Sequence, residues 1–152
     1  MPEKETIRKA EQDKQEGKAP STQAGEFVKE EIDHIREGKH GARSTKQAIA
    51  IGLSKARRAG VDLPPPKKGA VSEQTRTKAA RERAKGQASP GKPPSPTRSR
   101  AVAKALRREG KSAASRAALG RQAKASARGR GASNRQAAAR KAARTRKRAS
   151  GS

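Results

Sequence analysis

The chain has 152 residues, of which 39 are Lys or Arg and 14 are Asp or Glu, so its formal net charge is +25 at pH 7. It contains no cysteine, tryptophan or tyrosine, which excludes disulfides, thiolate chemistry and platforms of stacked aromatic side chains. Only 14 residues are Phe, Ile, Leu or Val, too few for a highly charged chain to build a large core. We therefore expect a mostly disordered protein with all-α segments.

The charge is unevenly distributed. Ten of the 14 acidic residues lie within residues 1–42, whereas residues 43–152 carry 31 basic residues against four acidic ones. Like charges at this density repel one another unless a polyanion or counterions neutralise them. Nucleic acid is therefore the first partner that the sequence indicates.

Residues 1–21 are predicted to form a charged N-terminal helix followed by a linker. Pro2 suits the first helical position, acidic residues fill the first turn and Gly17 can end the helix. The N-terminus has no apolar run, and nowhere do ten apolar residues follow one another. The sequence therefore predicts neither a signal peptide nor a membrane span, and a cytoplasmic protein is expected.

Residues 22–63 are predicted to form a helical hairpin. The first helix is indicated by apolar residues at helical spacing, with Ser21 or Thr22 as its cap and Gly38 as its end; these apolar residues are Phe27, Val28, Ile32 and Ile35.

The second helix of the hairpin has clear signals at both ends. Ser44 and Gln47 fit a capping box, and Gly60 can adopt the left-handed conformation after the last turn. A stripe of Ile49, Leu53 and Ala56 can pack on the first helix. The expected exposed side then carries three cations: Lys55, Arg57 and Arg58.

The hairpin could also be a helix-turn-helix that reads DNA. In that interpretation Lys46 and Gln47 would begin a recognition helix in the major groove. Domains of that kind usually have a third helix, which the sequence does not clearly supply. A structural hairpin, or one that docks on a partner protein, is the alternative, and its oligomeric state is left open.

The loop and second helix resemble a known family. Residues 44–57 read Ser-Thr-Lys-Gln-Ala-Ile-Ala-Ile-Gly-Leu-Ser-Lys-Ala-Arg. This pattern is similar to that of small basic bacterial proteins of unknown function, some of which are described as DNA-binding or plasmid-stabilisation proteins. The resemblance implies DNA as a partner and assigns no catalytic residue.

Residues 64–96 read as a Pro-rich basic linker with one weak helical stretch at 72–85. Two Ser-Pro-x-basic tetrapeptides, at 89–92 and 95–98, resemble turns of linker-histone tails that enter a minor groove. Lys92 is then a possible additional contact. A plain proline-rich linker is the competing interpretation.

Residues 97–152 form an Ala/Lys/Arg-rich tail with three helix-competent segments that we expect to fold on binding. Its composition is similar to that of bacterial linker-histone-like proteins. Phosphate contacts are expected from its cations; the candidate nucleic-acid-binding residues are Arg98, Arg100, Lys104, Arg107, Arg108, Arg116, Arg121, Lys124, Arg140, Lys141, Arg144, Arg146, Lys147 and Arg148.

Enzymatic chemistry and cofactors are not predicted. His34 and His40 lie six residues apart across a helix end, a spacing that does not indicate a metal site. The adjacent Glu30 and Glu31 are expected on an exposed helix face, where paired carboxylates have no acid–base role. No small-molecule substrate, metal or cofactor is expected.

Three functions fit the sequence. The leading one is non-enzymatic, largely sequence-nonspecific DNA binding and compaction in the bacterial nucleoid by phosphate neutralisation. The second is binding to RNA or the ribosome. The third is a disordered stress protectant, which 14 glycines and a mean hydropathy of −1.14 would suit, although such a role needs no net charge of +25.

Overall fold

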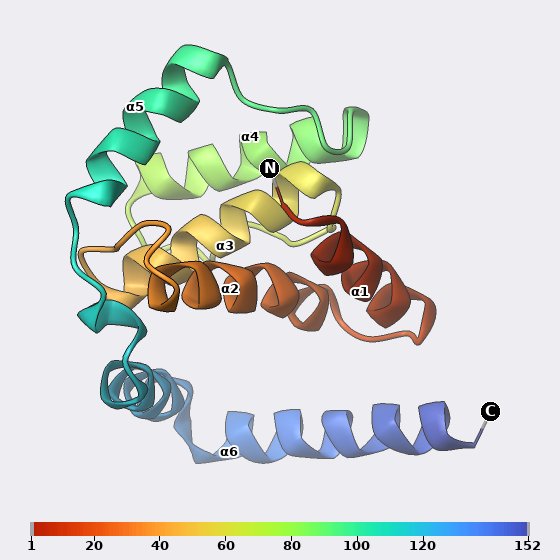
Figure 1. Ribbon diagram of the computed structural model, residues 1–152. Helices are drawn as coiled ribbons and strands as arrows, with labels where there is room; N and C mark the ends of the chain where they lie inside the picture. The colour runs from red at the N-terminus through yellow and green to blue at the C-terminus, as the bar shows by residue number, and fades with distance from the viewer. Residues whose placement is uncertain (1, 152) are drawn as a thin grey trace.

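The computed structural model describes residues 2–151, and these residues form an all-helical protein without a named strand. Figure 1 shows a bundle in which α2 and α3 lie side by side, with α1 and α4 packed on them. None of the helices described is both long enough and apolar enough to cross a membrane. The helices, in chain order, are α1 (Lys4–Gln15), α2 (Pro20–Arg36), α3 (Thr45–Ala59), α4 (Glu73–Ala88), α5 (Pro96–Arg107), the short 3-10 helix η1 (Ser112–Ala114) and α6 (Arg116–Ser150).

The expectation of a mostly disordered chain is therefore wrong, since residues 2–151 form a compact helical bundle with six α-helices. The reason lies in alanine, which the count of large apolar residues left out. Two core clusters combine the few large apolar side chains with alanines. The helices therefore approach closely, and little space between them remains unfilled. The buried alanines are Ala10, Ala24, Ala42, Ala48, Ala56, Ala79, Ala113 and Ala114.

Helices α2 and α3 approach each other closely at Gly52. A Cβ atom built there would lie 2.6 Å from the Cα of Val28 and 2.9 Å from its backbone nitrogen. Real side chains do not approach backbone atoms so closely, so the two helices would have to separate. Phe27, which is 1 % exposed, and Ile35, which is fully buried, lie in α2, and their packing depends on this short interhelical distance.

We expect Gly52→Ala to lower the free energy of unfolding by about 1–2 kcal/mol, because overpacking against backbone outweighs the gain in helix propensity. Gly25, also in α2, is a matched control, since a Cβ there meets nothing within 4 Å. Gly25→Ala should raise stability by about 0.5–1 kcal/mol. Urea unfolding followed by circular dichroism measures both. Equal effects at the two positions would contradict this account of the helix contact.

The predicted ends of α3 are observed. The Ser44 hydroxyl accepts from the Gln47 backbone N–H at 3.1 Å, and the Gln47 side chain accepts from the Arg43 N–H at 2.6 Å. Gly60 has φ 106°, and the Val61 N–H donates to the Ala56 carbonyl at 3.0 Å. In contrast, α2 starts at Pro20 with Ala19 as its N-cap, so Ser21 and Thr22 lie inside the helix.

Residues 64–96 are not simply a linker, because they contain α4 and α4 covers α3. The contact is tight at Gly86, where a Cβ atom would overlap the carbonyl oxygen of Arg57. The Arg83 guanidinium also donates to Asp62 Oδ1 at 2.7 Å. The helix therefore covers part of the side of α3 that the sequence predicted to be exposed.

The last turn of α5 and the segment after it contact the bundle before α6 begins. The Gly41 N–H donates to the Leu106 carbonyl at 2.9 Å, and the Ala42 N–H donates to the Gly110 carbonyl at 3.1 Å. The buried Ala113 and Ala114 of η1 then join the core cluster that contains Ile35. The tail is thus tied to the bundle by η1 and by Leu119 near the start of α6, which packs against the same cluster. The rest of α6 is a long helix that Figure 1 shows leaving the bundle.

Candidate nucleic-acid interface

The cations of α5 lie on an exposed helix. Arg100, Lys104 and Arg107 are spaced by four and three residues, so they share one face. Arg98 lies elsewhere on the helix, and Arg108 is its C-cap. Every one of these five side chains is exposed. The helix therefore presents a short row of positive charge to solvent.

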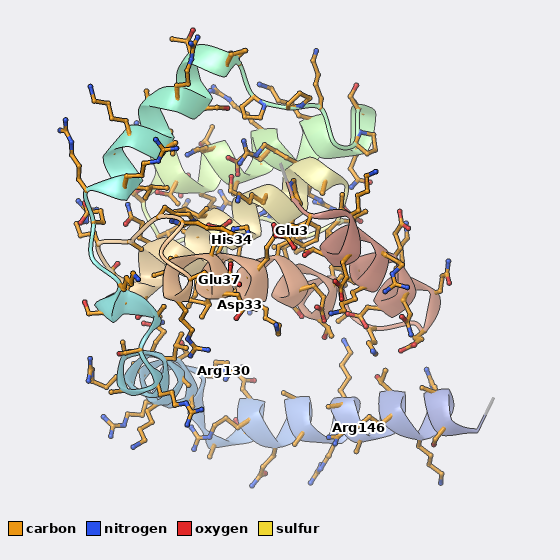
Figure 2. The ribbon with its side chains drawn as sticks, in the orientation of Figure 1. Glu3, Asp33, His34, Glu37, Arg130 and Arg146 are labelled. Atoms are coloured by element: carbon orange, nitrogen blue, oxygen red, sulfur yellow. The ribbon has the colours of Figure 1, made fainter. Side chains whose placement is uncertain are left out.

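The second and larger group of cations lies on α6, which has no buried residue in its length of 35 residues. Gly131, with φ 73°, divides it into two helical parts. Figure 2 shows Arg130 and Arg146 on these two parts, and basic side chains project from α6 on several sides. The exposed cations of α6 are Arg116, Arg121, Lys124, Arg128, Arg130, Arg135, Arg140, Lys141, Arg144, Arg146, Lys147 and Arg148.

The bundle and the tail differ in how their cations are paired. In the bundle, ion pairs neutralise many basic side chains, among them Lys29 with Asp33 at 2.6 Å and Arg83 with Asp62 at 2.7 Å. The Arg83 hydrogen bond lowers the pKa of the Asp62 carboxyl. Within residues 2–151, leaving Arg148 aside, no basic side chain from Lys85 onward forms an ion pair with a carboxylate. The tail therefore keeps its charge available for an external anion.

Three residues that were predicted as additional contacts have structural roles instead. Lys55 donates to the buried Glu31 carboxylate. Arg57 is 6 % exposed and donates to the Leu63 and Pro64 carbonyls at 3.2 Å, and burial lowers its pKa. The Gln47 side chain belongs to the capping box. Contacts between helices and within caps hold these three side chains in place, which makes them less accessible to nucleic acid than the exposed cations of the tail.

The other additional candidates remain accessible to different degrees. Lys46 and Lys92 are exposed, and Arg58 is half-buried with its Nε 3.4 Å from the Ser54 carbonyl. No contact that the structure describes joins these three residues to the basic row on α5 or to α6. They stay separate, weak candidates.

A further cationic feature was missed by sequence reasoning. Arg36, Lys111 and Arg116 line an open crevice of about 380 Å³ where α6 begins. Arg36 comes from the end of α2, and its Nε donates to the Ala114 carbonyl at 2.9 Å. Cations from two distant segments, the end of α2 and the residues on either side of η1, thus meet at the N-terminus of a long helix, which suits a phosphate. The sequence has no signal for it, because the grouping depends on how η1 returns to α2.

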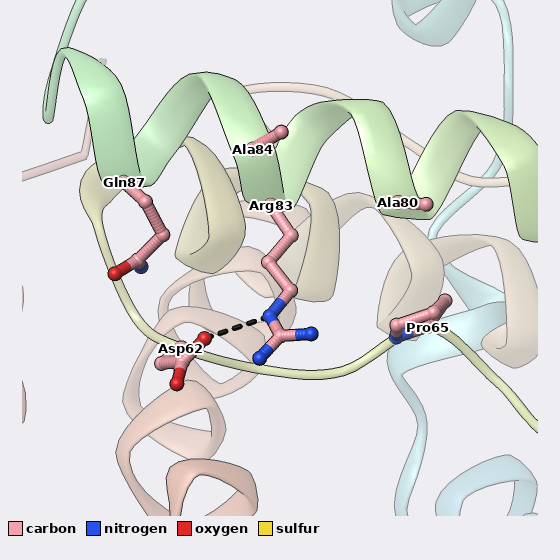
Figure 3. Close-up of a pocket in the computed structure, with 6 residues that line it drawn as sticks. All are labelled: Asp62, Pro65, Ala80, Arg83, Ala84 and Gln87. Atoms are coloured by element: carbon pink, nitrogen blue, oxygen red, sulfur yellow. Dashed lines mark hydrogen bonds and ion pairs between the residues drawn. The ribbon is translucent and has the colours of Figure 1, made fainter.

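The second crevice offers few polar groups that could bind a ligand. Figure 3 shows it between α4 and the extended segment after α3, where the Arg83–Asp62 ion pair crosses it. It has a volume of about 330 Å³ and is open to solvent. Apart from that ion pair, its lining is Pro65, Ala80, Ala84 and Gln87. This lining contains no set of polar groups that could position a substrate.

The paired carboxylates and the histidines are the clearest departure from the sequence interpretation. Glu31 is fully buried and Glu30 is 6 % exposed, whereas both were expected on an exposed face. The rings of His34 and His40 approach to 6.2 Å between centroids, edge to face. The spacing Glu31-x-x-His34 puts both side chains on one face of α2. This spacing is the one feature of the sequence that could have indicated the cluster of carboxylates and histidines.

Comparison with known proteins gives a similarity for the first part of the chain only. Residues 4–68 match a family described as a family of unknown function (DUF6496). Searches of curated proteins and of solved structures found no significant match. The matched segment comprises α1, α2 and α3 and ends before α4. The basic helices α5 and α6 lie outside it, so their role has to be argued from their own chemistry.

Proposed function

We propose that the protein is a non-enzymatic, largely sequence-nonspecific DNA-binding and DNA-compacting protein of the bacterial nucleoid. The observation that supports this most is the contrast between a bundle in which several cations pair with carboxylates and a helical tail whose exposed cations, Arg148 aside, have no ion pair with a carboxylate within residues 2–151. A polycation of this kind gains affinity when phosphates replace the counterions condensed on DNA.

The shape of the tail suits phosphate contacts more than base recognition. The part of α6 after Gly131 spans residues 132–150, which corresponds to about 28 Å of helix. Duplex DNA presents one negative charge per about 1.7 Å of axis, so a rod of this length can follow many phosphates. The cations occupy more than one side of α6, which would allow one helix to contact two duplex segments and so compact DNA.

Salt dependence tests this function directly. Binding of the full-length protein to a duplex of 30 base pairs is measured at several NaCl concentrations between 50 and 300 mM. We expect a slope of log K against log salt of about −5 or steeper, because each neutralised phosphate contributes about −0.9. A slope near zero would contradict binding through phosphates. The same series with single-stranded and folded RNA decides between DNA and RNA, and tighter binding to RNA would overturn the assignment to DNA.

A truncated variant for this test must keep the residues that pack in the core. Removing residues 97–152 would delete Ala113 and Ala114 from the core, so lost binding could then reflect unfolding. Removing residues 132–152 leaves those contacts in place. We expect that shorter protein to remain folded by circular dichroism and to bind the duplex with a clearly shallower salt slope. An unchanged slope would show that α6 beyond Gly131 makes no phosphate contacts.

A further inference from the structure

Two buried carboxylates and both histidines of the chain meet beside α2. Glu30, Glu31 and His34 come from α2 itself, and His40 comes from the loop that leads to α3. Single potential ligand atoms from Glu31, His34 and His40 lie within 4.8 Å of one another. The two imidazoles are each 15 % exposed, so the cluster lies just beneath the surface, within reach of a small ion.

The two carboxylates each leave one oxygen without a hydrogen bond. Glu30 Oε1 accepts from the Glu3 backbone N–H at 3.1 Å, and Glu31 Oε1 accepts from Lys55. The second oxygens, Glu30 Oε2 and Glu31 Oε2, are buried and have no hydrogen-bond partner. A buried anionic oxygen without a partner is costly. A positive group beside these two oxygens would therefore stabilise the cluster.

The orientation of His40 makes this place more specific. His40 Nδ1 lies 2.9 Å from the Gly41 carbonyl oxygen; because a carbonyl only accepts, Nδ1 must carry the proton. The Nε2 of a neutral ring is then a free electron pair, and it lies 3.1 Å from Glu31 Oε2. Their alignment does not make a hydrogen bond. Two ligand atoms on adjacent positions of a tetrahedral zinc ion are about 3.3 Å apart, so the spacing fits an ion that both atoms share.

The groups around the cluster hold the candidate ligands by hydrogen bonds of the kind found around metal sites. Ligating histidines commonly donate their second N–H to a carbonyl, as His40 does to Gly41, and ligating carboxylates are held by an outer hydrogen bond, as Lys55 provides to Glu31. His34 Nε2 lies 3.1 Å from Glu3 Oε1, and Figure 2 shows these two side chains close together. The His34 hydrogen bond lowers the pKa of the Glu3 carboxyl. Glu3 and Glu30 add negative charge beside the site.

We propose that Glu31, His34 and His40 bind one zinc ion and thereby link the loop before α3 to α2. Two imidazoles and a carboxylate are ligands for zinc and similar transition metals, whereas Mg²⁺ and Ca²⁺ require oxygen ligands. Three protein ligands leave a fourth position for water. The bound ion stabilises the folded bundle, since the unfolded chain does not hold these ligands together.

Calorimetric titration of the metal-stripped, full-length protein with ZnCl₂ tests the proposal. We expect saturable binding of one ion per chain with a micromolar or lower Kd, a higher melting temperature with Zn²⁺, and no such effect with MgCl₂. His34→Gln and His40→Gln should each weaken binding at least tenfold. Asp33→Asn is the matched control: Asp33 is a neighbouring carboxylate of α2 that pairs with Lys29 and points away from His34 in Figure 2. It should bind Zn²⁺ as the wild type does.

A second measurement does not depend on variants that fold. The chain has two histidines, so NMR of the wild-type imidazoles should show both changing together and saturating at one equivalent of Zn²⁺. Saturation at several equivalents, a change in only one imidazole, or no binding at millimolar Zn²⁺ would each overturn the proposal. In the calorimetric titration, wild-type affinity of a folded His40→Gln variant would also overturn it. The titration contains no nucleic acid, so its result is independent of the DNA-binding proposal.

Discussion

Replacing five cations of α6 by glutamine is expected to weaken binding to duplex DNA by two orders of magnitude or more at 150 mM salt. The variant changes Arg140, Lys141, Arg144, Arg146 and Lys147, all of which are exposed. Each lost phosphate contact removes about 0.9 from the salt slope, so the slope should become shallower by up to about 4.5. Glutamine favours helix as arginine and lysine do, so the helix should persist by circular dichroism.

A control with the same change in net charge separates location from total charge. It replaces five exposed basic residues of α1 and α2 by glutamine: Lys4, Arg8, Lys9, Lys14 and Lys29. If DNA contacts the tail, the control should keep most of the affinity and nearly all of the slope. Equal losses in the two variants would mean that net charge alone governs binding, and the interface on α6 would be wrong.

Local signals in the sequence predicted the α2–α3 hairpin, because both ends of α3 are encoded within a few residues, whereas the predicted N-cap of α2 was wrong. Ser44, Gln47 and Gly60 have the hydrogen bonds and the backbone conformation that their types favour. The bundle as a whole was missed, since its stability depends on small residues at helix contacts. Gly52 and Gly86 read as weak helix formers, yet each permits a close approach between helices that no local pattern reveals.

The candidate sites divide in the same way. Exposed cations of the tail follow from composition, because a charged residue with nothing to pack against stays in solvent. Lys55 and Arg57 could not be distinguished from them, since their burial depends on Glu31 of another helix and on the turn after α3. The approach of His34 and His40 also depends on the path of a loop, which residue spacing along one helix does not determine.

The Lys55–Glu31 pair predicts the second large effect, which is on stability. Glu31 is fully buried and its Oε1 accepts from Lys55, whose side chain is 22 % exposed. Lys55→Met keeps most of the aliphatic stem and leaves a buried carboxylate without its cation. Breaking such a pair costs about 3–5 kcal/mol, a large part of the stability of a small domain. Urea unfolding in EDTA, followed by far-ultraviolet circular dichroism, measures the loss without a contribution from metal.

The double variant Glu31→Gln with Lys55→Met identifies the source of that loss. Removing both charges should restore most of the stability, because the cost of the single variant lies in the uncompensated carboxylate and not in missing packing of the lysine stem. A double variant as unstable as Lys55→Met alone would assign the loss to the stem. Under conditions where both variants are folded, their DNA salt slopes should equal that of the wild type, since Lys55 is held by Glu31 and does not face a phosphate. A shallower slope in both folded variants would return Lys55 to the nucleic-acid interface, where the sequence alone had placed it.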